Sequence, residues 1–217
     1  MCLKNLLFVT ASLLFFQLAE AQRNYNDYNL LGIQGGYTIF DLNTDDLTTE
    51  SGSGFQVGFT SRGAFRNNFD LIYGISFSSE SVKVLGNDIL EERLLEYNIS
   101  GALLNFLGSY NIVKKHLSVE FGPMLQVSGK MKLKDSAFEN YVLDGYNTLL
   151  AKDIQDISTI NLRLAGGITA GAENFRVTAQ YQYGVTNTLN KLNDKELEND
   201  DFKGNTSTIL LGAVFYF

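Results

Sequence analysis

The sequence holds few side chains that could carry out covalent chemistry. Its only histidine, His116, lies in Lys114-Lys115-His116, between two segments in which apolar residues alternate with polar ones. A serine hydrolase would need such a base beside its nucleophile, and an exposed position in a short turn is the simpler interpretation. The only cysteine is Cys2, close to the N-terminus. We therefore predict no catalytic residue and no enzyme.

Candidate ligands for a metal or a phosphate group are also weak. Gly32-Ile-Gln-Gly-Gly36 is rich in glycine but leads into no helix, so it does not fit a phosphate-binding loop. Two acidic groups lack the spacing of an EF-hand, and solvated loop charge explains them better. These groups are Asp41, Asp45 and Asp46, and Glu198, Asp200 and Asp201. No metal or cofactor site is predicted.

The first 21 residues are typical of a secretory signal. Lys4 supplies the basic region, 6–16 the apolar stretch, and Ala19-Glu20-Ala21 a cleavage site. The apolar stretch is about half the ~20 residues that a membrane-spanning helix needs. Residues 22–217 would then form one domain with 16 basic and 23 acidic residues. This acidic balance argues against nucleic-acid binding, which usually shows a basic face.

Eight segments alternate with a period of two, which indicates β-strands. In each, an apolar row and a polar, glycine-rich row are expected on opposite faces. Pro123, the only proline, predicts a bulge or a local gap in the strand pairing of the fifth segment. The segments are 30–40, 54–62, 69–80, 94–107, 117–130, 160–170, 175–183 and 208–217.

Two segments depart from a clean alternation. In the third, Ile72 interrupts the polar row. In the fourth, the end at Leu104-Asn105-Phe106 fits neither row. Its apolar row is predicted to comprise Leu95, Tyr97, Ile99 and Leu103, opposite a polar row with Glu96.

The composition of the two rows favours a membrane barrel, in which apolar rows meet lipid and polar rows fill a narrow lumen. Small residues in the polar rows suit the limited space inside eight strands. Aromatic residues mark both ends of the apolar rows, as in interfacial girdles. We assign to these girdles Phe69, Phe77, Phe175, Tyr181, Tyr183, Phe215 and Phe217.

The spacers between the segments alternate in length. Those at 63–68, 108–116 and 171–174 are short, whereas 41–53, 81–93, 131–159 and 184–205 are long. Short turns at one end and long loops at the other are typical of outer-membrane barrels. We predict a closed antiparallel eight-stranded transmembrane β-barrel in the outer membrane, surrounded by its lipid, with both termini and the short turns on the periplasmic side.

Eight charged residues are predicted to point into the lumen and to pair there, because an unpaired buried charge is costly. Parity and strand direction sort them into two layers, each with two acids and two bases, and we interpret both layers as structural. The layer near the short turns comprises Arg62, Asp70, Glu120 and Arg176, and the layer near the long loops comprises Glu80, Glu96, Lys130 and Arg163.

Two further segments suggest contacts with other molecules. The last segment ends on Phe217 and must pair with the first to close the barrel, and its terminal aromatic residue resembles the signal that the barrel-insertion machinery reads. The longest spacer, 131–159, exceeds the ~12–15 residues usual for a simple loop. It keeps many apolar residues, so we expect it to be partly ordered, either capping the barrel mouth or the strand ends or presenting a surface to a protein partner.

The chain resembles a known family. The N-terminal signal, the strand spacing, Glu120-Phe-Gly-Pro-Met124, Tyr181-Gln-Tyr-Gly-Val185 and Phe217 are similar to the small outer-membrane β-barrel proteins of Bacteroidetes that are called PorT-like. The resemblance covers the chain after residue 21 and implies the barrel and the outer-membrane location. For one branch of that family it implies a role in protein secretion, to which no residue here can be matched.

The expected function is therefore a structural or interaction role in the outer membrane. No open pore is expected, because side chains fill the space inside eight strands. One alternative is a component of a protein secretion or translocation system. Another is a soluble, secreted, lipocalin-like barrel, which would require the Phe and Tyr rows to point inward.

Overall fold

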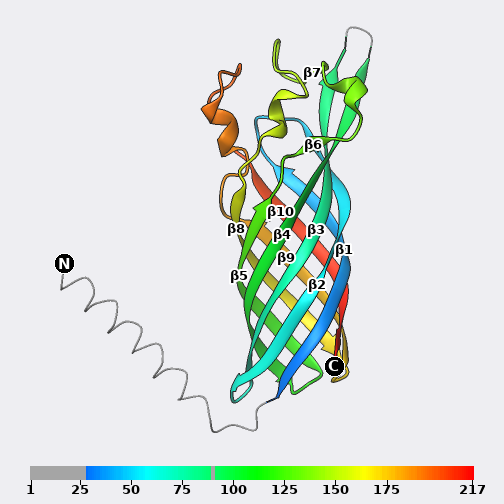
Figure 1. The fold of residues 1–217 in the computed structure, drawn as a ribbon, viewed down its shortest axis with the longest axis vertical. Helices are drawn as coiled ribbons and strands as arrows, with labels where there is room; N and C mark the ends of the chain where they lie inside the picture. Colours follow the sequence, from blue (N-terminus) through cyan, green and yellow to red (C-terminus); the bar gives the residue numbers. More distant parts are fainter. Residues whose placement is uncertain (1–27, 89–90) are drawn as a thin grey trace, which may run out of the picture.

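The computed structural model describes residues 28–88 and 91–217, and it shows eight antiparallel strands closed into a barrel (Figure 1). β1 pairs with both β2 and β10, which closes the ring as predicted. The predicted secretory signal, 1–21, lies outside the described residues. The strands of the ring are β1 (Asn29–Asn43), β2 (Thr49–Arg66), β3 (Phe69–Asn87), β4 (Glu92–Val113), β5 (Leu117–Ser128), β8 (Ile160–Gly171), β9 (Phe175–Gly184) and β10 (Asn205–Tyr216).

Two very short strands and three 3₁₀ helices complete the described chain. β6 (Lys132–Leu133) pairs with β4, and β7 (Val142–Leu143) pairs with β3. The helices are η1 (Ser136–Phe138), η2 (Asp153–Gln155) and η3 (Asn190–Asp194). No helix among the described residues is long and apolar enough to cross a membrane.

The barrel has two unlike ends. At the turn end, three tight turns join the strands, and the C-terminus lies beside them (Figure 1). Asn67 and Lys115 adopt positive φ angles of 56° and 65° in two of these turns. At the loop end, β3 and β4 rise well above the other strands, and the segments 129–159 and 185–204 also lie above the barrel at this end (Figure 1).

Three of the predicted spacers are mostly strand. β1 and β2 extend to leave only 44–48 between them, and β3 and β4 extend to leave 88–91. The predicted turn 108–116 shrinks to 114–116, because β4 continues to Val113. The prediction of long loops at 41–53 and 81–93 is wrong. Strand pairing continues there because apolar side chains such as Leu42, Val82 and Val84 are buried between the strand extensions.

β4 explains the irregular fourth segment. Its odd-numbered residues face inward along most of its length, and Leu95, Tyr97, Ile99 and Leu103 are all buried. The prediction that these four form a lipid-facing row is wrong. The inward face is apolar at the loop end, where Leu95, Tyr97 and Ile99 join a hydrophobic core. Deeper in the lumen, a smaller apolar cluster contains Ile72, Leu103, Leu107, Met124 and Ala165.

Pro123 produces a gap and no bulge. The β4–β5 pairing stops at Asn105 opposite Met124 and resumes at Gly108 opposite Phe121, with the same register on both sides. On its other side β5 pairs with β8 without interruption, including Pro123 opposite Leu164. The missing backbone donor of proline accounts for the interruption on one side of the strand.

Candidate functional site in the lumen and the loop-end head

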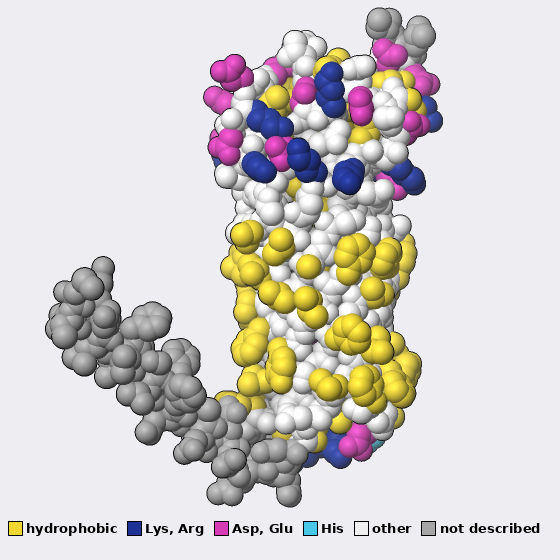
Figure 2. All heavy atoms as spheres, viewed as in Figure 1, with side chains coloured by type: hydrophobic (Ala, Val, Ile, Leu, Met, Phe, Trp, Pro, Cys, Tyr) yellow, Lys and Arg dark blue, Asp and Glu magenta, His cyan; other side chains and the backbone are white. Residues whose placement is uncertain are grey.

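The outer wall of the barrel is a belt of exposed apolar side chains (Figure 2). Phe59, Phe121 and Phe217 are 62%, 62% and 64% exposed. From Phe69 to Phe77 the row on β3 rises by about 20 Å, at ~3.3 Å per residue and a tilt of about 40°. Charged side chains gather at the two ends on the face shown in Figure 2. A closed sheet with such a belt spans a membrane, and the short turns and long loops give it the architecture of an outer-membrane barrel.

The predicted girdle aromatics all lie on this outer wall. Phe175 pairs in register with Phe215 near the turn end, where the rings of Phe69 and Tyr110 are also 5.0 Å apart. The seven side chains are 40–64% exposed: Phe69, Phe77, Phe175, Tyr181, Tyr183, Phe215 and Phe217. Because these rows point outward, the interior is not that of a lipocalin-like barrel.

Arg62 organises the lumen near the turn end. Its Nε donates to Oδ2 of Asp70 at 2.7 Å, and its Nη1 donates to Oε1 of Glu120 at 3.1 Å. All three side chains are at least nine-tenths buried. The remaining donor, Nη2, reaches polar side chains of β4 and β5, namely Ser109 at 2.6 Å, Ser118 at 3.0 Å and Asn111 at 3.3 Å. One guanidinium thus ties β2, β3, β4 and β5 together across the lumen.

Arg176 lies in the same layer but forms no salt bridge with the described residues. Its Nε donates to the carbonyl oxygen of Ala172 at 3.3 Å, and its guanidinium lies 5.8 Å from the centre of the Tyr216 ring. Both Nη atoms lack a hydrogen-bond partner within the described chain. The expected balance of two paired acids and two paired bases is wrong here, because both carboxylates gather on Arg62.

The second layer, toward the loop end, is a single ion pair. Nη2 of Arg163 donates to Oε2 of Glu80 at 3.1 Å, and both side chains are almost completely buried. Nη1 of Arg163 donates to Gln182 and Thr208 at 3.2 and 3.1 Å. The ring of Phe40 lies 5.9 Å from this guanidinium, so the polar lumen meets the apolar core at Arg163.

Glu96 and Lys130 are not in the lumen, and their prediction as lumen charges is wrong. Glu96 points outward from β4 with a side chain that is 35% exposed, and it accepts from Nζ of Lys134 at 2.8 Å. Lys130 is exposed, just after β5 ends at Ser128. Both residues lie above the apolar belt, where the outer face of the chain meets water and charged side chains belong outside.

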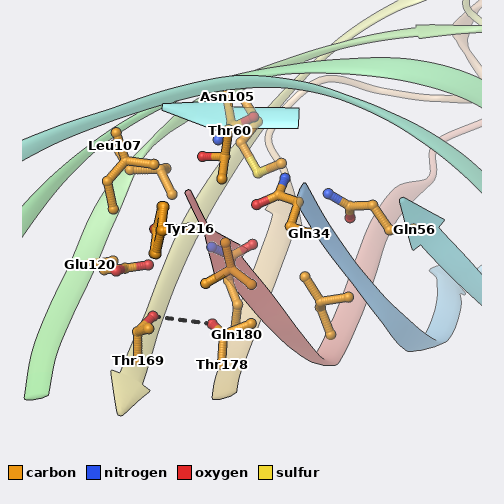
Figure 3. Close-up of a pocket in the computed structure, with 14 residues that line it drawn as sticks. Gln34, Gln56, Thr60, Asn105, Leu107, Glu120, Thr169, Thr178, Gln180 and Tyr216 are labelled. Carbon is orange, nitrogen blue, oxygen red and sulfur yellow. Dashed lines mark hydrogen bonds between the residues drawn. The ribbon is translucent and has the colours of Figure 1, made fainter. Parts of the chain in front are cut away.

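A small cavity lined by both polar and apolar side chains lies between the two charged layers (Figure 3). Its volume is about 40 Å³, enough for a few water molecules. Thr60 Oγ1 and Asn105 Oδ1 line it and have no hydrogen-bond partner within the described chain. Thr169 and Thr178 pair across its edge at 3.3 Å, as the dashed line in Figure 3 shows. Buried water would satisfy the two unpaired oxygens.

A hydrophobic core fills the loop end of the barrel. We call the parts that build it the loop-end head: the strand extensions above the belt together with 44–48, 129–159 and 185–204. The spacer 131–159, expected to be partly ordered, packs into this core, and Tyr97 donates its hydroxyl hydrogen to the Ala151 carbonyl at 2.9 Å. The core comprises Phe40, Leu42, Leu47, Val82, Val84, Leu95, Tyr97, Ile99, Met131, Leu143, Leu149, Ala151, Ile154, Ile157, Leu189, Leu192 and Phe202.

Glu198 connects the two long loops of the head. Its carboxylate accepts from the backbone N–H of Thr148 at 2.6 Å and of Asn147 at 2.9 Å, and also from both of their side chains. These bonds, led by the one from the Thr148 backbone, lower the pKa of Glu198 from 4.5 to about 2. The ionised carboxylate therefore holds the turn at Asn147 against the segment 185–204.

The acidic groups form no metal site in the part of the chain that the structure describes. Asp46 instead accepts from the backbone N–H of Lys203 at 2.7 Å. His116 is exposed in its turn, with Nδ1 2.8 Å from the Gly171 carbonyl oxygen. Sequence reasoning missed Ser109 and Asn111 as partners of Arg62. Their alternation with Tyr110 and Ile112 was the signal that β4 continues.

Comparison with known proteins gives structural neighbours only. No protein-family model matches the chain, and no curated protein has a significant sequence match. Among solved structures, Ail of Yersinia pestis, determined with the heparin analogue sucrose octasulfate, is 16% identical at a TM-score of 0.47, covering 87% of this chain and 99% of its own.

Two further solved structures give similar values. Neisserial surface protein A is 10% identical at a TM-score of 0.49, covering 86% of this chain and 97% of its own. The outer membrane protein OprG from Pseudomonas aeruginosa is 13% identical at a TM-score of 0.48, covering 88% of this chain and 97% of its own.

A prediction about stability follows from the Arg62 cluster, by which we mean Arg62 and its partners Asp70, Glu120, Ser109, Asn111 and Ser118. Arg62→Gln leaves two buried carboxylates without their counter-charge, so it should lower the free energy of unfolding by about 3–5 kcal/mol. Glu120→Ala should lower the free energy of unfolding by less, because Arg62 keeps Asp70 as an ion-pair partner. The control Glu96→Gln removes only an exposed pair and should cost about 0–1 kcal/mol. Urea unfolding in lipid vesicles, followed by circular dichroism, measures all three, and equal losses for Arg62→Gln and Glu96→Gln would contradict the assignment.

The Glu198 contact predicts a pH-dependent opening of the head. Because the folded pKa, about 2, is below the unfolded value of 4.5, the contact stabilises the head fully above pH 4.5 and is lost as pH falls toward 2. At each pH we compare pepsin cleavage within 131–159 in the wild-type protein and in Glu198→Gln. Wild type should be cleaved more slowly than Glu198→Gln at pH 4.5 and at the same rate near pH 2, and equal rates at pH 4.5 would refute the contact.

Proposed function

We propose that the protein is a closed, non-conducting outer-membrane barrel that serves an interaction or structural role through its loop-end head. The turn end faces the periplasm, and the head faces outward. The observation that carries the proposal is the filling of the interior. The Arg62 cluster, the Glu80–Arg163 pair and the core of the head follow one another along the barrel axis.

This filling argues against transport. The two charged layers bridge opposite parts of the wall, and the cavity between them measures about 40 Å³. Water-filled channels belong to barrels of 16–18 strands. Opening this lumen would require breaking a buried ion pair and displacing the head, including Phe40, which packs against Arg163.

The head supports an interaction role. Its segments 129–159 and 185–204 share a core, and they are tied by Glu198 and by the hydrogen bond from Tyr146 to the Asp46 carbonyl at 2.8 Å. A loop that served only to connect β5 and β8 would need no such core. An ordered loop surface pays less entropy on binding a protein than a disordered one, and we place the partner-binding surface on 131–159.

The more specific alternative is a component of a protein secretion or translocation system. Its support is the PorT-like resemblance carried by Glu120-Phe-Gly-Pro-Met124, Tyr181-Gln-Tyr-Gly-Val185 and Phe217. We also propose that β10 contacts the barrel-insertion machinery during assembly, for which the outward-facing Phe217 is the candidate residue.

Two measurements test the proposal. In planar bilayers, folded protein that shows heat-modifiable gel mobility should give no stable conductance steps, and a steady channel would contradict the closed lumen.

In cells, a photoreactive amino acid at Ala137, which is exposed on the head, should form protein adducts. The matched control is Ala172, an exposed alanine at the turn end. Adducts at Ala172 but none at Ala137 would contradict the role of the head.

A further inference from the structure

A second cavity lies at the turn end of the barrel, where Asp70 and Asn111 of the lumen form its inner side. It has a volume of about 390 Å³, within the ~300–1,000 Å³ typical of ligand pockets. The residue before β1, the β2–β3 turn and the β4–β5 turn enclose it. The lining side chains that bear on its chemistry are Tyr28, Phe65, Arg66, Asp70, Lys114 and Lys115.

This turn-end pocket carries uncompensated positive charge. Arg66 and Lys114 are exposed and form no ion pair with any residue in 28–88 or 91–217. Lys115 pairs with Glu173 at 2.5 Å and lies 5.8 Å from the centre of the Tyr28 ring. The one carboxylate in the lining, Asp70, already accepts from Arg62 at 2.7 Å and from the Tyr28 hydroxyl at 2.6 Å. The unoccupied donors of Arg66 and Lys114 therefore suit an anion.

The pocket also borders the apolar belt. Phe65 lines it and is 49% exposed, and Ile112 and Val113, 55% and 49% exposed, immediately precede Lys114. A ligand seated there would have its anionic part between Arg66 and Lys114 and an apolar part beside Phe65 and Ile112.

Most basic residues of the loop end, in contrast, form ion pairs. Several of them are paired with neighbouring carboxylates: Lys83 with Glu50, Lys134 with Glu96, Lys191 with Asp156 and Lys203 with Asp201. Two of the three basic residues that line the turn-end pocket, Arg66 and Lys114, thus keep their charges unpaired among the described residues, at the edge of the apolar belt where lipid headgroups lie.

We propose that the turn-end pocket binds the phosphate headgroup of an anionic phospholipid from the surrounding leaflet. Arg66 and Lys114 hold the phosphate, and Phe65 and Ile112 pack against the acyl chains. The inference rests on the membrane-spanning barrel and not on the proposed role of the head. The conductance and crosslinking experiments therefore do not test it.

Native mass spectrometry of the detergent-solubilised protein, titrated with phosphatidylglycerol, tests the site. Arg66→Gln/Lys114→Gln should bind the lipid at least five-fold more weakly than wild type. The matched control Lys132→Gln/Lys152→Gln removes the same charge from exposed positions of the head and should bind as wild type does. Equal binding by all three proteins would overturn the proposal.

A second arm separates a lipid from a free anion. Inorganic phosphate in tenfold excess should not displace phosphatidylglycerol, and Phe65→Ala should weaken binding of the lipid although every cation is retained. Displacement by inorganic phosphate, or a Phe65→Ala protein that binds as wild type, would show a site for soluble anions and overturn the lipid assignment. Heat-modifiable mobility verifies that each variant is folded.

Discussion

The structure depends on one constraint: a paired strand keeps the same face inward along its whole length, while the medium around it changes. Within the belt the outside is lipid, so the outward residues Phe69 to Phe77 of β3 are apolar and the inward ones, from Asp70 to Glu80, are largely polar. Above the belt the outside is water, and the inward residues Val82 and Val84 are apolar. β1, β3 and β4 thus each line the polar lumen with one part and the apolar core of the head with another.

The position at which the inward-facing residues change from polar to apolar determines how the barrel is closed. Arg163 and Glu80 form the last charged layer, and Phe40 from the core of the head packs directly against it. Below that layer the lumen is held by buried polar contacts, which are specific but cost desolvation. Above it the head is held by apolar burial, which is non-directional and tolerates irregular loops. A narrow barrel can therefore present an ordered head although its own lumen is polar.

The sequence predicted the strands well and the orientation of their outer parts poorly. Alternation identified all eight strands, because it follows from the local period. Closure of the barrel predicted the pairing of the first strand with the last, and the missing donor of Pro123 predicted a bulge or a gap, of which the structure shows the gap. Alternation misplaced Glu96 and the row of Leu95, Tyr97 and Ile99, because faces were assigned by polarity on the assumption of one medium. The partners of Arg62 come from three other strands, and only the closed register brings them together.

The reversal of polarity along β4 can be measured directly by a cysteine scan, since the chain has no cysteine after Cys2. In proteoliposomes, a membrane-impermeant maleimide should label cysteine at Glu96 and Asn98, and a lipid-borne quencher should reach a fluorophore at Leu104 and Phe106. Cysteine at Tyr97 and Ile99 should react with neither. Lipid contact at Tyr97 and Ile99, with Glu96 protected from water, would contradict the account.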